Sequence, residues 1–294
     1  MTALRAKPSV RLVDTAAAAI AGAAADALLA ELETWPKPGL VSHVDRGSHD
    51  DMDAGTFRRS VAATQPYFGL LAAAGVDGAE MSELRRIGLG AERAMLVATG
   101  GVNTHRGAIF GLGLLCAAAG AAEATWQPPS FASLRCPAAV LGAIVRQRWG
   151  RAIAGGPIPL QSHGTQALRR FGAGGARAEA AGGFQSVLDV GLPALRLGRR
   201  LAPGNAEAAR VQAFFALLAA VDDTNLLHRG GADGLRDAQK AAAGFLAAGG
   251  VGQAAWIDAA AAVHRGFVRR RLSPGGCADL LAATLFMDRM ETGI

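Results

Sequence analysis

The sequence of 294 residues carries a formal net charge of +6, and 51% of its residues are hydrophobic while only 18% are charged. This balance excludes an intrinsically disordered chain, which needs low hydrophobicity and high charge. Three cysteines in this length exclude a disulfide-stapled scaffold. Because the hydrophobic fraction is mostly alanine, while β-branched and aromatic residues are sparse, the composition predicts an all-α protein.

Helical segments follow one another along the chain, separated by short breaks that contain glycine or proline. We expect Ser82 and Ser273 to cap the helices that follow them, and residues 172–183 to form a glycine-rich loop. No alternating strand pattern, internal repeat or long polar linker interrupts the series, so residues 1–294 are predicted to form a single-domain multi-helix bundle. The predicted helices span residues 15–33, 57–73, 82–98, 104–119, 138–149, 163–171, 206–228, 233–248, 251–270 and 273–290.

Two apolar segments raise the possibility of an export signal or a membrane span. The first contains Asp14 and Asp26 around a run of alanine, which is too weakly apolar for a good signal peptide. The second, residues 107–122, is shorter than the ~20 residues that a bilayer requires and is diluted by glycine and alanine. We therefore interpret both as helices of the bundle and expect a cytoplasmic protein with no membrane partner.

An alanine-rich bundle needs few polar residues to fold, so the places where polar residues and glycines gather are informative. The first is the loop around Lys37, followed by a second loop that contains His49, Asp50 and Asp51. One interpretation is a cation for phosphate with carboxylates for a divalent metal. The other is a plain loop whose aspartates cap the next helix.

A glycine pair before a helix start forms the next cluster. Gly100 and Gly101 permit a close backbone approach, and Asn103 or Thr104 can cap the helix, whose first amides then point outward. His105 and Arg106 add further donors, so the segment suits an anion, although its spacing matches neither a P-loop nor a Rossmann fingerprint. The alternative is an ordinary capped helix with a surface arginine.

Further clusters lie in the second half of the chain. They contain His163, Arg177 with Glu179, the group Asp222, Asp223, Asn225 and Arg229, and finally Asp279 after a glycine-opened helix start. The adjacent aspartates 222 and 223 are expected near the C-terminal end of a helix, where they oppose its dipole and a bound cation would offset this cost. Solvated loops, a surface helix end and a first-turn aspartate are the alternatives. As a set, the clusters suit a metal-bound polyphosphate, with carboxylates on Mg²⁺.

The same clusters resemble the triphosphoribosyl-dephospho-CoA synthase family from about Ala17 to Met290. Any single motif is weak evidence, whereas their joint order along the chain is specific. Arg106 stands where many members have lysine, and Trp35 stands where threonine is common. The motifs are Pro36-Lys37-Pro38-Gly39-Leu40-Val41, Gly47-Ser48-His49-Asp50-Asp51-Met52, Thr99 to Phe110, Ser162-His163-Gly164, Gly175 to Ala180, Asp223-Thr224-Asn225 with His228 to Gly231, and Ser273 to Leu281.

The resemblance implies an all-helical transferase that joins ATP to 3′-dephospho-CoA and releases adenine. The product is the prosthetic-group precursor for the acyl carrier subunit of malonate decarboxylase or citrate lyase, and residues 38–54 look more like the malonate decarboxylase branch. The implied partners are these two small molecules, without nucleic acid, and a homodimer is left open. The predicted catalytic residues are Asp51, Asp223 and His163. The predicted nucleotide-binding residues are Lys37, Gly100, Gly101, Asn103, Thr104, His105, Arg106, Arg177, Asn225 and Arg229, and the predicted magnesium ligands are Asp50, Glu92, Asp222 and Asp279.

Two rival functions are weighed against this hypothesis. A nucleic-acid-binding protein would explain the net charge and the arginine runs at 169–170, 199–200 and 269–271, but the sequence has a single tyrosine and scatters its basic residues among helices. A metal-dependent ADP-ribosyl hydrolase would also combine helices with clustered aspartates. It would use water where the synthase uses a ribose hydroxyl, so dependence on the acceptor separates the two enzymes.

Overall fold

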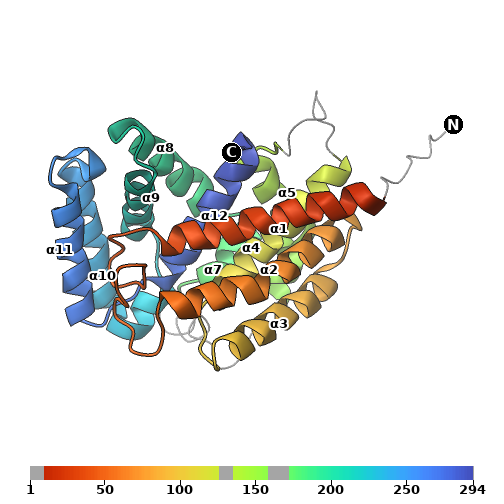
Figure 1. Ribbon diagram of the computed structural model, residues 1–294, viewed down its shortest axis with the longest axis horizontal. Helices are drawn as coiled ribbons and strands as arrows, with labels where there is room; N and C mark the ends of the chain where they lie inside the picture. The colour runs from red at the N-terminus through yellow and green to blue at the C-terminus, as the bar shows by residue number, and fades with distance from the viewer. Residues whose placement is uncertain (1–9, 126–134, 158–171, 294) are drawn as a thin grey trace.

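The computed structural model describes residues 10–125, 135–157 and 172–293 (Figure 1). Within these ranges the chain is helical and contains no strand, which confirms the all-α prediction. The helices are α1 (Val10–Leu32), α2 (Ala54–Val76), α3 (Met81–Ala98), α4 (Arg106–Thr125), α5 (Ala138–Gly155), α7 (Gly175–Gly182), α8 (Leu192–Leu201), α9 (Ala206–Ala220), α10 (Thr224–Ala247), α11 (Trp256–Arg269) and α12 (Gly275–Thr292), with a π-helical turn at Val187–Gly191 and a 3₁₀ turn at Gly250–Gly252.

Helix α4 packs against α1, α2, α3, α5, α7 and α12. Its contact with α2 is close enough that a Cβ on Gly120 would lie 1.9 Å from the Ala72 carbonyl oxygen. Helix α2 makes the reciprocal approach at Gly75, where a Cβ would lie 1.9 Å from the Ala117 carbonyl oxygen. The abundance of alanine and glycine therefore has a direct packing role, because larger side chains would push these two helices apart.

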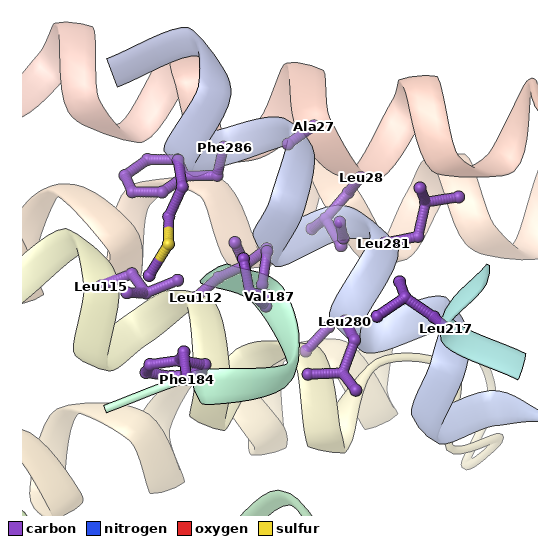
Figure 2. Close-up of a cluster of buried hydrophobic side chains, with 14 of the residues drawn as sticks. Ala27, Leu28, Leu112, Leu115, Phe184, Val187, Leu217, Leu280, Leu281 and Phe286 are labelled. Atoms are coloured by element: carbon purple, nitrogen blue, oxygen red, sulfur yellow. The ribbon is translucent and has the colours of Figure 1, made fainter. Parts of the chain in front are cut away.

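The larger apolar side chains fill the core between α1, α4, α9 and α12 (Figure 2). Leu112 of α4, Leu281 of α12 and Val187 of the π-helical turn are all fully buried there. Each such side chain contributes roughly 1.5–3 kcal/mol when it leaves water. The shared core fixes the relative positions of the N-termini of α4 and α12.

Two helices are long and apolar enough to cross a membrane by length and composition, at Thr15–Leu32 and Arg106–Ala124. In this bundle 56% of the first window and 72% of the second are buried. The burial of the second agrees with its interpretation as a core helix.

Several local predictions are wrong, each for an identifiable reason. Ser82 is not an N-cap, because α3 already begins at Met81. Part of the predicted loop at 172–183 is helix α7, whose alanines outweigh its flanking glycines. The segment between Phe184 and Asn205, for which no element is predicted, contains the π-helical turn and α8.

The predicted helix over 206–228 is in fact divided into α9 and α10. The first ends at Ala220 and the second begins at Thr224, so residues 221–223 connect two helices. Helix α10 then continues past Gly231, a break in the helix with φ of 63°. The predicted cap at Ser273 is also wrong, because the residue before α12 is Pro274 and the side chain that caps this helix comes from Asp223.

Candidate active site

The loop between α1 and α2 carries Lys37 into the interior. The imidazole Nδ1 of His264, on α11, lies 2.9 Å from the Lys37 carbonyl oxygen, and the Ser48 hydroxyl donates to the Leu272 carbonyl at 2.6 Å. Gly39 has a φ of 71°, and a Cβ there would lie 2.0 Å from the same Leu272 oxygen. The loop is therefore fixed against the segment that follows α11, which brings it beside α10 and α11 (Figure 1).

The Lys37 ammonium is fully buried and forms an ion pair with Glu31 of α1. Burial lowers the pKa of Lys37 and raises the pKa of Glu31, and the attraction between the two charges opposes both shifts. Removing one partner would leave the other charge buried without compensation, which costs several kcal/mol. The pair thus holds two opposite charges at a fixed position inside an apolar bundle.

His105 lies just before α4 and is 3% exposed. Its Nδ1 lies 2.6 Å from the Ser60 hydroxyl, which in turn accepts a hydrogen bond from Thr104 at 2.8 Å. Burial, with the nearby Lys37 charge, lowers the pKa of His105 to about 3, so the ring is neutral at physiological pH. Its buried Nε2 has no hydrogen-bond partner within the described ranges and is free to meet a ligand atom.

Asp223 joins the starts of two helices. Its Oδ1 accepts from the N–H groups of Asn225 at 2.8 Å and Leu226 at 3.1 Å, so it is the N-cap of α10. Its Oδ2 accepts from the N–H of Cys277 in α12 at 2.8 Å. Burial raises the pKa of Asp223, while these three N–H groups act in the opposite direction. The expected placement at a helix C-terminus is therefore wrong, and the carboxylate sits where helix dipoles favour a negative charge.

Asp279 brings the third helix start into the same place. Its carboxylate accepts from the Ala108 N–H in the first turn of α4, and its Oδ2 would lie 2.0 Å from a Cβ on Gly107. Burial raises the pKa of Asp279 well above its ordinary value, and the negative charges of Glu31 and Asp223 raise it further. Glu31, Asp223 and Asp279, which we call the acidic cluster, thus gather at the N-termini of α4, α10 and α12.

Other predicted residues lie at or before the starts of α12 and α4. The Asn225 amide nitrogen lies 2.6 Å from the position of a Cβ on Gly275, at the start of α12. The Asn103 Oδ1 accepts from the Arg106 N–H at 3.2 Å, which makes it the capping side chain of α4. Gly100 and Gly101 have φ values of 67° and 92° and face open space. A glycine turn therefore precedes the start of α4 and faces open space, and its role in anion binding stays a prediction.

Three predicted acids, Asp50, Asp51 and Asp222, are exposed, and the fourth, Glu92, is half-buried. The Asp50 side chain is 79% exposed and pairs with Arg271 at 2.8 Å, while that of Asp51 is 62% exposed and lies 3.6 Å from His49. Glu92 pairs with Arg106 at 3.0 Å, and the exposed Asp222 accepts from the Gln239 amide at 3.4 Å. In the part of the chain that the structure describes, no hydrogen bond or ion pair joins these four to the acidic cluster.

The two remaining arginines bind backbone carbonyls. Arg177 donates to the carbonyls of Ala154, Gly156 and Pro157, and Arg229 donates to that of Arg271 at 3.1 Å. Both therefore hold loops in this structure. His163, the predicted proton donor, lies outside the described residues.

Sequence reasoning missed Glu31, Ser60 and His264. Glu31 had a signal, because it is an acid between the core residues Leu28 and Leu32 of α1. Such an acid is rarely buried unless it is paired. Ser60 and His264 had none, since each is one polar residue among many on an amphipathic helix.

The sequence is similar to proteins of one enzyme family. Residues 17–294 match the family model described as ATP:dephospho-CoA triphosphoribosyl transferase. A protein of Azotobacter vinelandii named probable 2-(5″-triphosphoribosyl)-3′-dephosphocoenzyme-A synthase is 41% identical over 91% of this chain and 90% of its own length. Proteins with the same name from Pseudomonas fluorescens Pf-5 and Acinetobacter calcoaceticus are 41% and 38% identical, over 93% and 90% of this chain and 92% and 88% of their own lengths.

No solved structure matches the chain at a significant level. The family model covers nearly the whole sequence, and it includes every residue of the acidic cluster together with Lys37 and His105. The chain therefore belongs to the ATP:dephospho-CoA triphosphoribosyl transferase family, and it is a transferase.

Proposed function

We propose that this protein transfers the 5-triphosphoribosyl group of ATP to the 2′-hydroxyl of 3′-dephospho-CoA and releases adenine. The family match and the names of the relatives support the reaction. The structural observation that carries it is the acidic cluster, which collects carboxylates with raised pKa values beside one buried lysine at three joined helix starts. We also propose that residues 1–294 act as one cytoplasmic domain and that the product serves malonate decarboxylase rather than citrate lyase.

The proposed chemistry is a single inverting displacement at C1′ of the ATP ribose. The acceptor oxygen forms a bond to C1′, the bond from C1′ to adenine N9 breaks, and the hydroxyl proton passes to a carboxylate. Asp223 suits this role, because a raised pKa makes a carboxylate a stronger base near neutral pH. A negative charge beside C1′ would also stabilise an oxocarbenium-like transition state, as in glycoside hydrolysis.

His105 is proposed to bind and not to protonate. With a pKa of about 3 it stays neutral, so its unpartnered Nε2 can exchange a hydrogen bond with the nucleotide but cannot deliver a proton as an imidazolium. His163 remains the predicted proton donor to adenine. Asp51 remains the other predicted catalytic carboxylate.

The triphosphate is proposed to lie at the exposed start of α4. The predicted contacts there are Gly100, Gly101, Asn103, Thr104 and Arg106, with Lys37 behind them. A helix start supplies free N–H groups and a favourable dipole for an anion. Arg177, Asn225 and Arg229 stay predicted contacts, although the two arginines would first have to leave their present carbonyl partners.

The described residues contain no group of three or more His, Cys, Asp or Glu side chains arranged to hold a metal. A Mg²⁺ ion in a nucleotide site does not need such a group, because Mg²⁺ usually takes only one or two carboxylates and completes its shell with phosphates and water. Asp279 is the carboxylate proposed to hold it, and Mg²⁺ would neutralise part of the triphosphate charge there. Asp50, Glu92 and Asp222 stay predicted ligands.

The experiment is incubation of the purified protein with ATP and Mg²⁺, with and without 3′-dephospho-CoA. We expect adenine release only when the acceptor is present, and mass spectrometry should find the acceptor heavier by one triphosphoribosyl group. Release of adenine or of a free sugar phosphate without the acceptor would instead identify a hydrolase.

A further inference from the structure

A second feature lies on the opposite side of the loop that carries Lys37. It is a pocket of about 550 Å³ between this loop and α11, at the end of the molecule where α10 and α11 lie (Figure 1). We call it the arginine groove and define it by Trp35, Asp45, Arg46, His264, Arg265 and Arg269. Its volume falls within the roughly 300–1,000 Å³ of small-molecule sites.

The groove is positively charged. It contains three guanidinium groups and one carboxylate, and the carboxylate of Asp45 already has a partner in His264, 3.3 Å away. Arg46 makes only an exposed contact with Asp53 at 3.4 Å. Arg265 and Arg269 make no ion pair or side-chain hydrogen bond with any described residue. The groove thus holds at least two free guanidinium groups, the side chains best suited to bidentate contacts with phosphate.

An indole forms part of the same wall. The Nε1 of Trp35 is buried and has no hydrogen-bond partner among the described residues, and Trp35 is one of the residues that line the groove. A buried donor without a partner is costly unless a ligand or a water molecule meets it. The aromatic face offers a stacking surface for a nucleobase. Free cations beside an aromatic ring suit a nucleotide with a phosphate chain.

The groove adjoins the proposed reaction centre through a single residue. His264 lies in the groove and contacts the Lys37 carbonyl at 2.9 Å, whereas the Lys37 side chain points the other way and pairs with Glu31 of the acidic cluster. Lys37 therefore contacts the groove residue His264 through its backbone and the acidic cluster through its side chain. This matches a substrate whose anionic part and reacting hydroxyl lie on the same nucleoside.

Resting on the proposed function, we propose that the arginine groove binds the diphosphate and the adjoining adenosine of the acceptor, 3′-dephospho-CoA. Two polyanionic substrates must meet in one active site, and their phosphate chains repel each other unless separate cationic sites hold them. The start of α4 offers the triphosphate one such site on the His105 side of Lys37. The groove offers the other, on the His264 side.

The test is the double variant Arg265→Gln with Arg269→Gln, measured by calorimetric titration with 3′-dephospho-CoA and by steady-state kinetics with both substrates. Arg200→Gln is the matched control, because Arg200 is an exposed arginine of α8 outside the groove with no bond to a described residue. We expect the double variant to raise the Kd and the KM for 3′-dephospho-CoA about tenfold or more. The KM for ATP and the circular dichroism should match those of the control.

Each other outcome overturns part of the scheme. A raised KM for ATP with unchanged acceptor binding would assign the groove to the triphosphate, and unchanged values for both would remove it from substrate binding. If the wild type releases adenine and the double variant binds the acceptor normally, the proposed role of the groove is wrong and the proposed function stands. A wild-type protein that neither binds the acceptor nor releases adenine would contradict the proposed function itself. Trp35→Phe gives an independent reading, since it should abolish any change in tryptophan fluorescence caused by the acceptor.

Discussion

The acidic cluster and the loop that carries Asp50 and Asp51 contain the same kind of residues in opposite environments. Asp223 is 1% exposed and spends both carboxylate oxygens on backbone N–H groups, whereas the side chain of Asp50 is 79% exposed and pairs with one arginine. In the sequence both belong to glycine-rich motifs with adjacent aspartates. Burial and position at a helix start, and not the presence of an Asp-Asp pair, therefore identify the carboxylates whose pKa values are shifted.

The largest effect is expected for Asp223→Asn. An amide has one oxygen where the carboxylate has two, so either the start of α10 or the start of α12 loses its acceptor. We expect adenine release to fall about a hundredfold or more and the free energy of unfolding to fall by about 1–3 kcal/mol. The rate of adenine release and denaturant unfolding measure the two effects.

The neighbouring substitution Asp222→Asn is the matched control. Asp222 is exposed and has one weak contact with Gln239, so we expect its substitution to change the free energy of unfolding by no more than about 0.5 kcal/mol. Circular dichroism should remain helical in both variants. Near-normal turnover in Asp223→Asn would remove Asp223 from the site.

A smaller but sharper effect is expected for Gly107→Ala. The new Cβ would lie 2.0 Å from the Asp279 carboxylate, so either the aspartate or the start of α4 must move. We expect a loss of about 1–3 kcal/mol in the free energy of unfolding together with a marked loss of activity. Thermal and denaturant unfolding provide the measurement.

Gly22→Ala in α1 controls for the general effect of this substitution in a helix. No atom lies within 4 Å of a Cβ on Gly22, so this variant should be neutral or more stable by about 0.5–1 kcal/mol. An equally harmless Gly107→Ala would mean that Asp279 does not sit against α4 in solution.

Much of the fold and part of the site could be predicted from the sequence. Alanine-rich composition predicts helices because it acts through local propensity, and the glycine turn before α4 is a local signal as well. The break between α9 and α10 was missed because residues 221–223 contain neither glycine nor proline. Asp223 itself supplied the signal, as an N-cap residue before a new helix.

The remaining features depend on tertiary contacts. Nothing local shows that Glu31 and Lys37 form a buried pair, or that the Asp279 carboxylate reaches Gly107 from a helix distant in sequence. The raised pKa values follow only from that assembly. The local sequence pattern therefore predicted which segments contribute to the candidate site, whereas tertiary packing determines which of their acidic residues lie together.

The pH dependence of stability should also distinguish the acidic cluster from the exposed loop that carries Asp50. The pKa of Asp279 is raised in the folded state, so its stabilising contribution is complete below the unfolded pKa of about 3.8 and is lost as pH rises through the folded pKa. The free energy of unfolding should fall in this window with a slope of up to about 1.4 kcal/mol per pH unit. Urea unfolding of the wild type and of Asp279→Asn between about pH 4 and pH 8 measures it. Identical slopes would show that Asp279 titrates normally.

The smallest effect is expected for Asp50→Asn, the direct test of the exposed region. The ion pair with Arg271 lies in solvent, where such pairs contribute about 0–1 kcal/mol, so stability should hardly change and the pH slope should stay that of the wild type. Adenine release measured over a range of Mg²⁺ concentrations then decides the role of this loop. An unchanged Mg²⁺ dependence would leave the metal to the acidic cluster. A requirement for about tenfold more Mg²⁺ would mean that the loop folds over the nucleotide once it is bound, and that the buried and exposed acids act together in the complex.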